Sequence, residues 1–144
     1  MKALVLHGPN LNLLGRRELD VYGKATLEEI DRLLQDEART LGISLEIHQT
    51  AREGEIIELL HRGIDSVDGA IINPAAYSHT SRAIADAMRA VPFPVVEVHL
   101  SNIHAREPWR RRSVTADASA GVITGFGPQS YVLGLRALAE ILRG

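Results

Sequence analysis

The sequence predicts an α/β fold with a doubly wound, five-stranded parallel sheet. Short, nearly continuous apolar runs alternate with longer amphipathic segments, and the apolar runs stop at glycine, proline or asparagine. Parallel strands have this composition because helices cover both faces of their sheet. The chain has 144 residues, of which 45% are hydrophobic and 24% charged, so we expect one compact domain over residues 1–144.

Each expected strand corresponds to one short apolar run. The five strands are expected at residues 3–6, 43–47, 69–73, 95–98 and 120–124. Right-handed crossovers between such strands favour a flavodoxin-like sheet. In sheets of this kind, ligands bind beyond the carboxyl ends of the strands.

Helices are expected where apolar residues recur at three- and four-residue spacing. The first begins at a capping box formed by Thr26 and Glu29, and Gly42 ends it. Ser78 is the expected cap of the third helix. The helices after the first are expected at about residues 56–63, 78–90 and 128–142.

Composition excludes several classes of protein and site. Lys and Arg total 16 and Asp and Glu total 18, so the net charge of −2 gives no general attraction to nucleic acid or to an anionic membrane. The absence of cysteine excludes disulfides, thiol nucleophiles and cysteine-based metal sites. No apolar run is long enough for a signal peptide or a membrane span. We therefore expect a cytoplasmic protein with no nucleic-acid and no membrane partner.

Polar residues follow three of the expected strands. Asn10 lies just beyond the first strand, Asn73 ends the third, and Glu97 and His99 lie at the end of the fourth. Because the carboxyl ends of parallel strands meet at one edge of a sheet, we expect these side chains to gather there. Asparagine is also a common turn residue, which is the alternative interpretation of Asn10 and Asn73.

His99 is the candidate general acid. It lies two residues after Glu97, so both side chains point to the same face of the strand. A carboxylate beside an imidazole orients the ring and holds its proton. A structural histidine is the alternative. His7, His48 and His61 are assigned to the surface or to packing, and His104 receives no assignment.

A basic cluster follows the fourth expected strand, at Arg106, Arg110, Arg111 and Arg112. A solvated face is the first interpretation. If this stretch is helical, spacing by four places Arg106 and Arg110 on one side, where two guanidinium groups suit an anionic substrate. The cluster is too short and too poor in aromatic residues to indicate nucleic acid.

Residues 8–25 are irregular and rich in glycine, asparagine and charge, and we expect them to form a lid over the site. Within them, Tyr22 lies near Arg16 and Arg17. The pairing of a phenol with arginine suggests a tyrosinate base. Packing of the lid against the body is the alternative role for Tyr22.

A comparison of energies tests whether arginine can make a phenol basic. A phenol has a pKa of about 10, so ionising it at pH 7 costs about 4 kcal/mol. One guanidinium about 4 Å away supplies about that much at an effective dielectric constant near 20. Desolvation opposes ionisation, so one arginine is just adequate and a second cation or dipole would help.

Three ordered blocks resemble the type II 3-dehydroquinate dehydratase family. They are residues 8–15 (GPNLNLLG), 73–81 (NPAAYSHTS) and 97–107 (EVHLSNIHARE). Arg17-Glu18 and Tyr22-Gly23 follow the first block, and Arg110 follows the third. The resemblance extends from the first expected strand to the last helix. Leu19 departs from the pattern, because many members have proline there, and the difference concerns only the stiffness of the lid.

The resemblance implies a lyase that dehydrates 3-dehydroquinate to 3-dehydroshikimate in the shikimate pathway of aromatic amino-acid biosynthesis. It also implies a single flavodoxin-like catalytic domain, no cofactor, no metal and a homo-oligomer, namely a dodecamer of trimers. The expected partners are thus the small-molecule substrate 3-dehydroquinate and further copies of the chain.

Matching positions assign a role to each site residue. The resemblance implies that Tyr22 removes the C2 proton as a tyrosinate held by Arg17, and that Asn10 helps to stabilise the enolate through water. It implies that His99 protonates the departing hydroxyl, with Glu97 behind it. The implied substrate-binding groups are Asn73, His79, Asp86 and Arg110 for the ring hydroxyls, and the backbone amides of Leu100 and Ser101 for the carboxylate.

Two other classes of function are weighed against this one. A flavodoxin- or receiver-like binding module needs a phosphate- or flavin-binding loop, or an acidic pair after the first strand. Here the first strand ends in residues 7–10 (HGPN) without an acidic residue, and residues 8–15 are not a Walker loop. A metal-dependent lyase or hydrolase would use Glu97, His99 and His104, but the five-residue spacing of the histidines across a strand–helix boundary is poor for a metal. A flavin spectrum would favour the first class, and chelator-sensitive activity the second.

Overall fold

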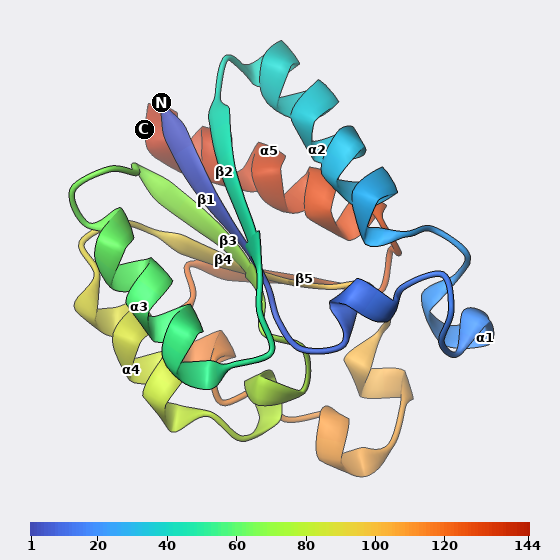
Figure 1. The fold of residues 1–144 in the computed structure, drawn as a ribbon. Coiled ribbons are helices and arrows are strands. Elements are labelled where there is room, and N and C mark those ends of the chain that lie inside the picture. Colours follow the sequence, from blue (N-terminus) through green and yellow to red (C-terminus); the bar gives the residue numbers. More distant parts are fainter.

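The computed structural model describes all 144 residues, and its centre is a five-stranded parallel sheet (Figure 1). The strands are β1 (Lys2–His7), β2 (Ser44–Gln49), β3 (Gly69–Asn73), β4 (Val95–His99) and β5 (Gly121–Thr124). Their order in the sheet is β2-β1-β3-β4-β5. The chain therefore builds outward from β1 to β2 and then returns to β3, which makes the β1–β3 boundary the switch point of the sheet. The predicted strands and fold class are confirmed.

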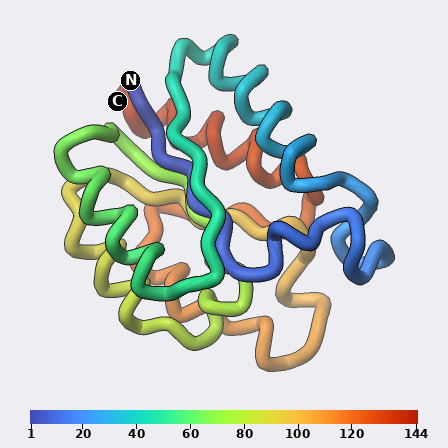
Figure 2. The backbone as a smooth tube through the Cα atoms, in the orientation of Figure 1, coloured from blue at the N-terminus to red at the C-terminus, as the bar shows by residue number.

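Four helices of at least nine residues cover the two faces of the sheet (Figure 1). α2 (Leu27–Leu41) and α5 (Gln129–Arg143) pack on one face, and α3 (Glu53–Gly63) and α4 (Arg82–Ala90) pack on the other. No helix has the length and apolar character that crossing a membrane requires. The backbone tube brings the two ends of the chain together at the end of the sheet opposite the long loops (Figure 2).

Alternate residues of the central strands enter different cores. Val5 and Ile71 pack with α2 and α5, whereas Leu6 and Ile72 pack with α3 and α4. All four side chains are at most 1% exposed. Burial on both faces explains why these strands are continuous apolar runs in the sequence.

The capping signals of the first long helix act as predicted. The Thr26 hydroxyl accepts a hydrogen bond from the Glu29 amide at 3.2 Å, and Gly42 ends the helix with φ +71°. Glycine adopts this left-handed conformation without the steric cost that a side chain imposes.

The predicted start of the third helix at Ser78 is wrong. Ala75–His79 form a separate 3₁₀ turn, and α4 begins at Arg82 with Ser81 as its cap. The Ser81 hydroxyl accepts from the Ile84 amide at 3.0 Å, whereas Ser78 is buried. The turn separates from the helix at Ser81, whose backbone is extended with φ −91° and ψ 95°. The turn itself begins at Ala75, which has φ +53° and whose amide donates to the Asn73 side chain. His79 is the last residue of this extra turn, which lies beyond the carboxyl end of β3.

The two long loops contain only short helical pieces. Residues 8–25 include a 3₁₀ turn at Leu11–Leu13 and the short helix α1 (Leu19–Tyr22). The segment between β4 and β5 has 3₁₀ turns at Ile103–Ala105, Pro108–Arg110 and Ala116–Ala118. The first of these loops and the start of the second lie on the same side of the sheet, beyond the carboxyl ends of the strands (Figures 1 and 2).

Candidate active site

A cleft opens beyond the carboxyl ends of β1, β3 and β4. The residues that line this cleft include Asn10, Arg17, Tyr22, Asn73, His79, His99, Leu100, Ser101, Arg106 and Arg110. Nine of these were predicted as site residues, and they come together from separate parts of the chain. Arg106 is the addition.

Gly8 allows the ends of β1 and β3 to meet. Its amide donates to the Asn73 carbonyl at 2.8 Å. A Cβ atom at this position would lie only 2.7 Å from the Pro74 carbonyl oxygen. Just beyond it, Asn10 has φ +70°, a conformation that asparagine tolerates better than most residues. The two asparagines therefore reach one cleft because glycine precedes the turn.

His99 and Glu97 form a buried pair at the end of β4. The His99 Nε2 atom lies 2.8 Å from Glu97 Oε2, and Glu97 is fully buried. The Ser113 hydroxyl donates to the same carboxylate at 2.8 Å, and the Thr115 hydroxyl also donates to it. Burial raises the pKa of Glu97, but hydrogen bonds from His99, Thr115 and Ser113 outweigh this effect and lower the pKa. Glu97 is therefore a carboxylate that fixes the His99 ring, whose other edge faces the cleft.

Tyr22 lies against two guanidinium groups. Its hydroxyl is 2.7 Å from Arg106 Nη1 and 3.5 Å from Arg17 Nη2. The guanidinium carbons of Arg17 and Arg106 lie 4.6 and 5.0 Å from the centre of the Tyr22 ring. Two positive charges therefore lie beside one phenol group.

The solvated-face interpretation is wrong for half of the basic cluster. Arg106 and Arg110 have side chains only 10% and 16% exposed, and both line the cleft. Arg111 and Arg112 are exposed, as that interpretation expects. Arg106 and Arg110 reach the cleft from a loop and a 3₁₀ turn, not from one helix. The sequence analysis found that a second cation beside Tyr22 would help, but it did not assign this role to Arg106.

Glu18 links the loop 8–25 to the body of the protein. Its carboxylate lies 2.7 Å from Arg17 Nη2 and 3.4 Å from Arg106 Nη2. The hydrogen bond from Arg17 lowers the pKa of Glu18, so the side chain is an anion at neutral pH. Glu18 also has φ +38°, an uncommon conformation for a residue with a side chain. The anion and the two cations form a cluster around Tyr22.

The opposite part of the cleft contains His79 and Arg110, with Trp109 between them. The Arg110 guanidinium lies 4.1 Å from the Trp109 ring centre, and the His79 ring meets the Trp109 ring edge-on at 5.2 Å. His79 Nδ1 lies 2.8 Å from the Arg112 carbonyl oxygen. Burial lowers the pKa of His79, so its ring is neutral at pH 7.

The loop after β4 offers two backbone donors. The Leu100 carbonyl accepts from the Gly127 amide at 2.9 Å, and the His99 carbonyl accepts from Gly125 at 3.3 Å. The amide N–H groups of Leu100 and Ser101 have no acceptor within the chain. Free amides at the wall of a cleft suit an anion such as a carboxylate.

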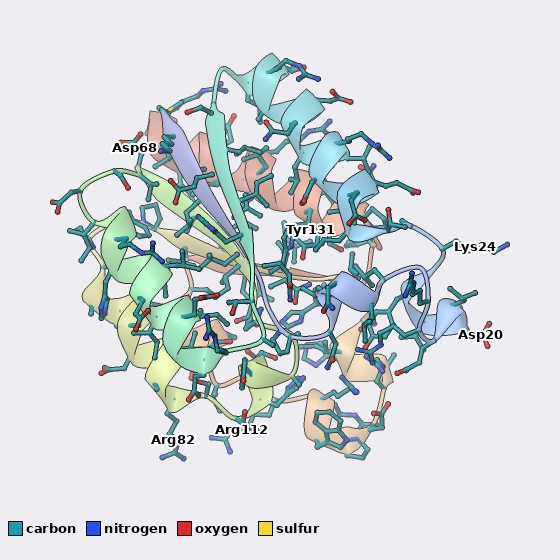
Figure 3. All side chains as sticks on the ribbon, in the orientation of Figure 1. Asp20, Lys24, Asp68, Arg82, Arg112 and Tyr131 are labelled. Carbon is teal, nitrogen blue, oxygen red and sulfur yellow. The ribbon has the colours of Figure 1, made fainter.

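Asp86 is the one predicted site residue that lies apart from the cleft. It is exposed on α4 and borders a separate shallow depression with Arg82, Arg89 and Arg112. Arg82 and Arg112 mark this surface in Figure 3. Within one chain, Asp86 therefore does not join the other site residues.

The alternative metal site is not assembled. His104 is exposed and does not line the cleft, whereas Glu97 is buried behind His99. No three histidine, aspartate or glutamate side chains are grouped so that they could hold a metal ion.

Comparison with known proteins identifies the family. Residues 1–139 match the family model described as dehydroquinase class II. The chain belongs to this family. The 3-dehydroquinate dehydratase of Desulforudis audaxviator (strain MP104C) is 55% identical over 142 residues, which are 99% of this chain and 95% of that protein. The corresponding protein of Clostridium acetobutylicum is 50% identical over 99% of both chains.

Solved structures of class II dehydroquinases share the fold. The crystal structure of type II dehydroquinase from Butyrivibrio crossotus superposes with a TM-score of 0.94 at 38% identity, over 96% of this chain and 97% of that one. The enzyme from Propionibacterium acnes gives a TM-score of 0.92 at 42% identity, over 96% of both. The resemblance seen in the three sequence blocks is confirmed, and the chain is an enzyme of the type II dehydroquinase class.

Proposed function

We propose that this dehydroquinase converts 3-dehydroquinate to 3-dehydroshikimate, a step of the shikimate pathway, with Tyr22 as base and His99 as acid. The observation that carries the proposal is one cleft lined both by a phenol between two guanidinium groups and by an imidazole on a buried carboxylate. Dehydration beside a ketone needs these two functions: a base for the proton on carbon and an acid for the departing hydroxyl.

The base is Tyr22 as tyrosinate. One cation about 4 Å from an anion contributes about 4 kcal/mol at an effective dielectric constant near 20, and two cations leave a margin against desolvation. Arg106 contributes more than Arg17, because it lies closer to the phenol oxygen. The tyrosinate takes the C2 proton and the electron pair moves into the ketone as an enolate, which Asn10 helps to stabilise through water.

The acid is His99. It gives a proton to the departing hydroxyl, which leaves as water while the enolate collapses to the conjugated ketone. The Glu97 carboxylate lies against His99 Nε2 and fixes the orientation of the ring. All of these groups belong to the chain itself, so the proposed reaction uses no cofactor and no metal.

Substrate binding uses the rest of the cleft. The free amides of Leu100 and Ser101 bind the carboxylate, and Asn73, His79 and Arg110 bind ring hydroxyls. Residues 8–25 close over the substrate as the lid of a single catalytic domain and exclude water from the enolate. We place the enzyme in the cytoplasm, where pathways of small-molecule metabolism operate.

We further propose a homo-oligomer, a dodecamer built of trimers. Asp86 supports assembly, because its position on α4 allows it to serve only the cleft of a neighbouring copy. Light scattering at micromolar protein should then give a mass far above 15.7 kDa. A monomer that retains full activity would contradict the proposed role of Asp86.

The test of the function follows the ultraviolet absorbance of the conjugated product after addition of 3-dehydroquinate. Tyr22→Phe keeps the ring but removes the base, so kcat should fall by about 10²- to 10⁴-fold while the substrate still binds. Tyr77→Phe is the matched control, because the Tyr77 hydroxyl bonds to the Ala51 carbonyl at 2.8 Å outside the cleft. Near-normal kcat in Tyr22→Phe would mean that another group is the base.

A further inference from the structure

A short segment, residues 112–115, passes behind the cleft between β4 and β5. It lies between the 3₁₀ turns Pro108–Arg110 and Ala116–Ala118. None of its residues lines the cleft, and none has a part in the proposed reaction. Thr115 is nevertheless fully buried, and Ser113 is half-buried. The hydroxyl groups of these two residues therefore make their contacts inside the protein.

Both hydroxyl groups contact the carboxylate of Glu97. The Ser113 hydroxyl donates to Glu97 Oε2 at 2.8 Å, and the Thr115 hydroxyl donates to Oε1. Oε2 also accepts a hydrogen bond from His99 Nε2, which lies 2.8 Å away. Glu97 is fully buried, and a buried carboxylate is costly unless its oxygens accept hydrogen bonds. The three donors hold both oxygens of Glu97 in one orientation.

The Ser113 hydroxyl is itself fixed by the turn that follows it. Its oxygen accepts a hydrogen bond from the Ala116 amide at 3.0 Å, where the next 3₁₀ turn begins. A hydroxyl group has a single hydrogen to donate. Because the Ala116 N–H occupies one side of the Ser113 oxygen, that hydrogen is directed to the carboxylate of Glu97.

The orientation of Glu97 decides which edge of the His99 ring faces the cleft. A carboxylate only accepts hydrogen bonds, so His99 Nε2 carries a hydrogen. Nδ1 is then the ring nitrogen left for the cleft that His99 lines. A rotated carboxylate would move away from Nε2 and leave the ring free to turn. The proposed acid therefore presents Nδ1 only while Glu97 keeps its place.

The segment is anchored on its other side to the 3₁₀ turn that follows β3. The carbonyl oxygen of Arg112 lies 2.8 Å from His79 Nδ1, and the Val114 amide donates to the Ser78 carbonyl at 2.7 Å. The Arg112 side chain points away from the molecule, so only its backbone takes part (Figure 3). Contacts alternate along the segment: backbone groups bind the turn, and the side chains between them bind the buried carboxylate.

We propose that Ser113 and Thr115 are positioning residues, whose hydroxyl groups hold the Glu97 carboxylate in the orientation that turns His99 toward the substrate. The inference rests on the acid role proposed for His99. Neither hydroxyl touches the substrate, and both act through Glu97. The ring must be aligned when its proton moves to the departing hydroxyl, so the loss of a positioning hydroxyl should lower kcat and leave KM nearly unchanged.

Kinetics separate positioning from packing. Thr115→Val keeps the branched side chain and removes the hydroxyl, and we expect kcat to fall about tenfold with KM within about twofold, because a hydrogen bond to a charged group is lost. Ser113→Ala, at a partly exposed site, should act in the same way. Thr115→Ser retains the hydroxyl, so its kcat should stay within about twofold of the wild type.

Thr50→Val is the matched control. Thr50 is also buried, and its hydroxyl accepts from the Arg52 amide at 3.1 Å, outside the cleft. kcat should stay unchanged in this variant. A lower melting temperature in Thr115→Val with a wild-type kcat would overturn the inference. An equal fall of kcat in Thr115→Ser, or a wild-type kcat in Ser113→Ala, would also count against it.

A second measurement does not depend on turnover. The chain has six histidines, so the ring signals of protein labelled with ¹⁵N-histidine are few enough to assign, and they report which ring nitrogen carries the hydrogen. The His99 signals should shift in Thr115→Val and in Ser113→Ala, and not in Thr50→Val. Unmoved His99 signals would overturn the inference, whereas an inactive wild-type protein with shifted signals would count only against the proposed reaction.

Discussion

The guanidinium of Arg106 donates to the Tyr22 hydroxyl at 2.7 Å, although 84 residues separate the two in the sequence. Arg17, five residues before Tyr22, lies at 3.5 Å. The nearer charge should matter more for the anion. We therefore expect Arg106→Ala to reduce kcat by about 10²- to 10³-fold, more than Arg17→Ala does. Steady-state kinetics test this order. Arg111→Ala, an exposed member of the same cluster, is the control and should leave kcat unchanged; a larger effect for Arg17→Ala would reverse the assignment.

Glu97→Gln should make stability less dependent on pH. The pKa of Glu97 is lowered in the folded protein, so its charge stabilises the fold above the ordinary pKa near 4.5, and this contribution disappears as the pH falls through the lowered value. Glu97→Gln should therefore be less stable than the wild type at pH 7, and the difference should shrink below pH 4.5. Melting temperatures measured from pH 3 to pH 8 give the comparison. A difference that grows toward low pH would contradict the assigned charge.

Trp109 should report on substrate binding. It is the only tryptophan, and it contacts both His79 and Arg110. Binding that immobilises these partners should change its fluorescence, with a midpoint near KM. Trp109→Phe keeps a flat ring and should retain KM within about threefold, whereas Trp109→Ala should raise KM about tenfold by freeing Arg110. Equal KM values for the two variants would mean that the ring does not position its neighbours.

Gly8→Ala should destabilise the fold by about 2 kcal/mol, the typical cost of forcing an atom into a filled space. The added Cβ would lie 2.7 Å from the Pro74 carbonyl oxygen, which is backbone and cannot swing away. Gly54→Ala is the control: it lies in α3, a Cβ there has no neighbour within 4 Å, and alanine favours helix. In denaturant unfolding, the free energy of unfolding should fall in Gly8→Ala and rise in Gly54→Ala. An unchanged free energy of unfolding in Gly8→Ala would show that the backbone where β1 and β3 end can move to accept the added Cβ atom.

Local signals in the sequence predicted most of the fold. The apolar runs predicted the five strands, and Thr26 and Gly42 marked the ends of a helix, because each of these signals depends on residues only a few positions apart. The start of α4 was placed too early because Ser78 and Ser81 are equally good caps in the sequence. The extended backbone of Ser81, which separates the turn from the helix, leaves no local signal that distinguishes Ser81 from Ser78.

The sequence predicted those site residues that lie in or next to the three ordered blocks at residues 8–15, 73–81 and 97–107. Arg106 was left without a role because its partner comes from a distant loop. Asp86 matched a family position, but its exposure on α4 depends on the packing of the chain. Contacts between distant elements are set by tertiary structure, which a single sequence does not display.

The cluster of Glu18, Arg17, Tyr22 and Arg106 also limits how the protein can be re-engineered. Residues 8–25 look like an exchangeable surface loop, and loops of this kind are common targets for grafting between relatives. Here the loop supplies a phenol and a carboxylate, while the body supplies the nearer guanidinium. A chimera that takes the loop from one relative and residue 106 from another would inherit a base without its matched cation. The two segments form one transplantable unit, and they must be exchanged together.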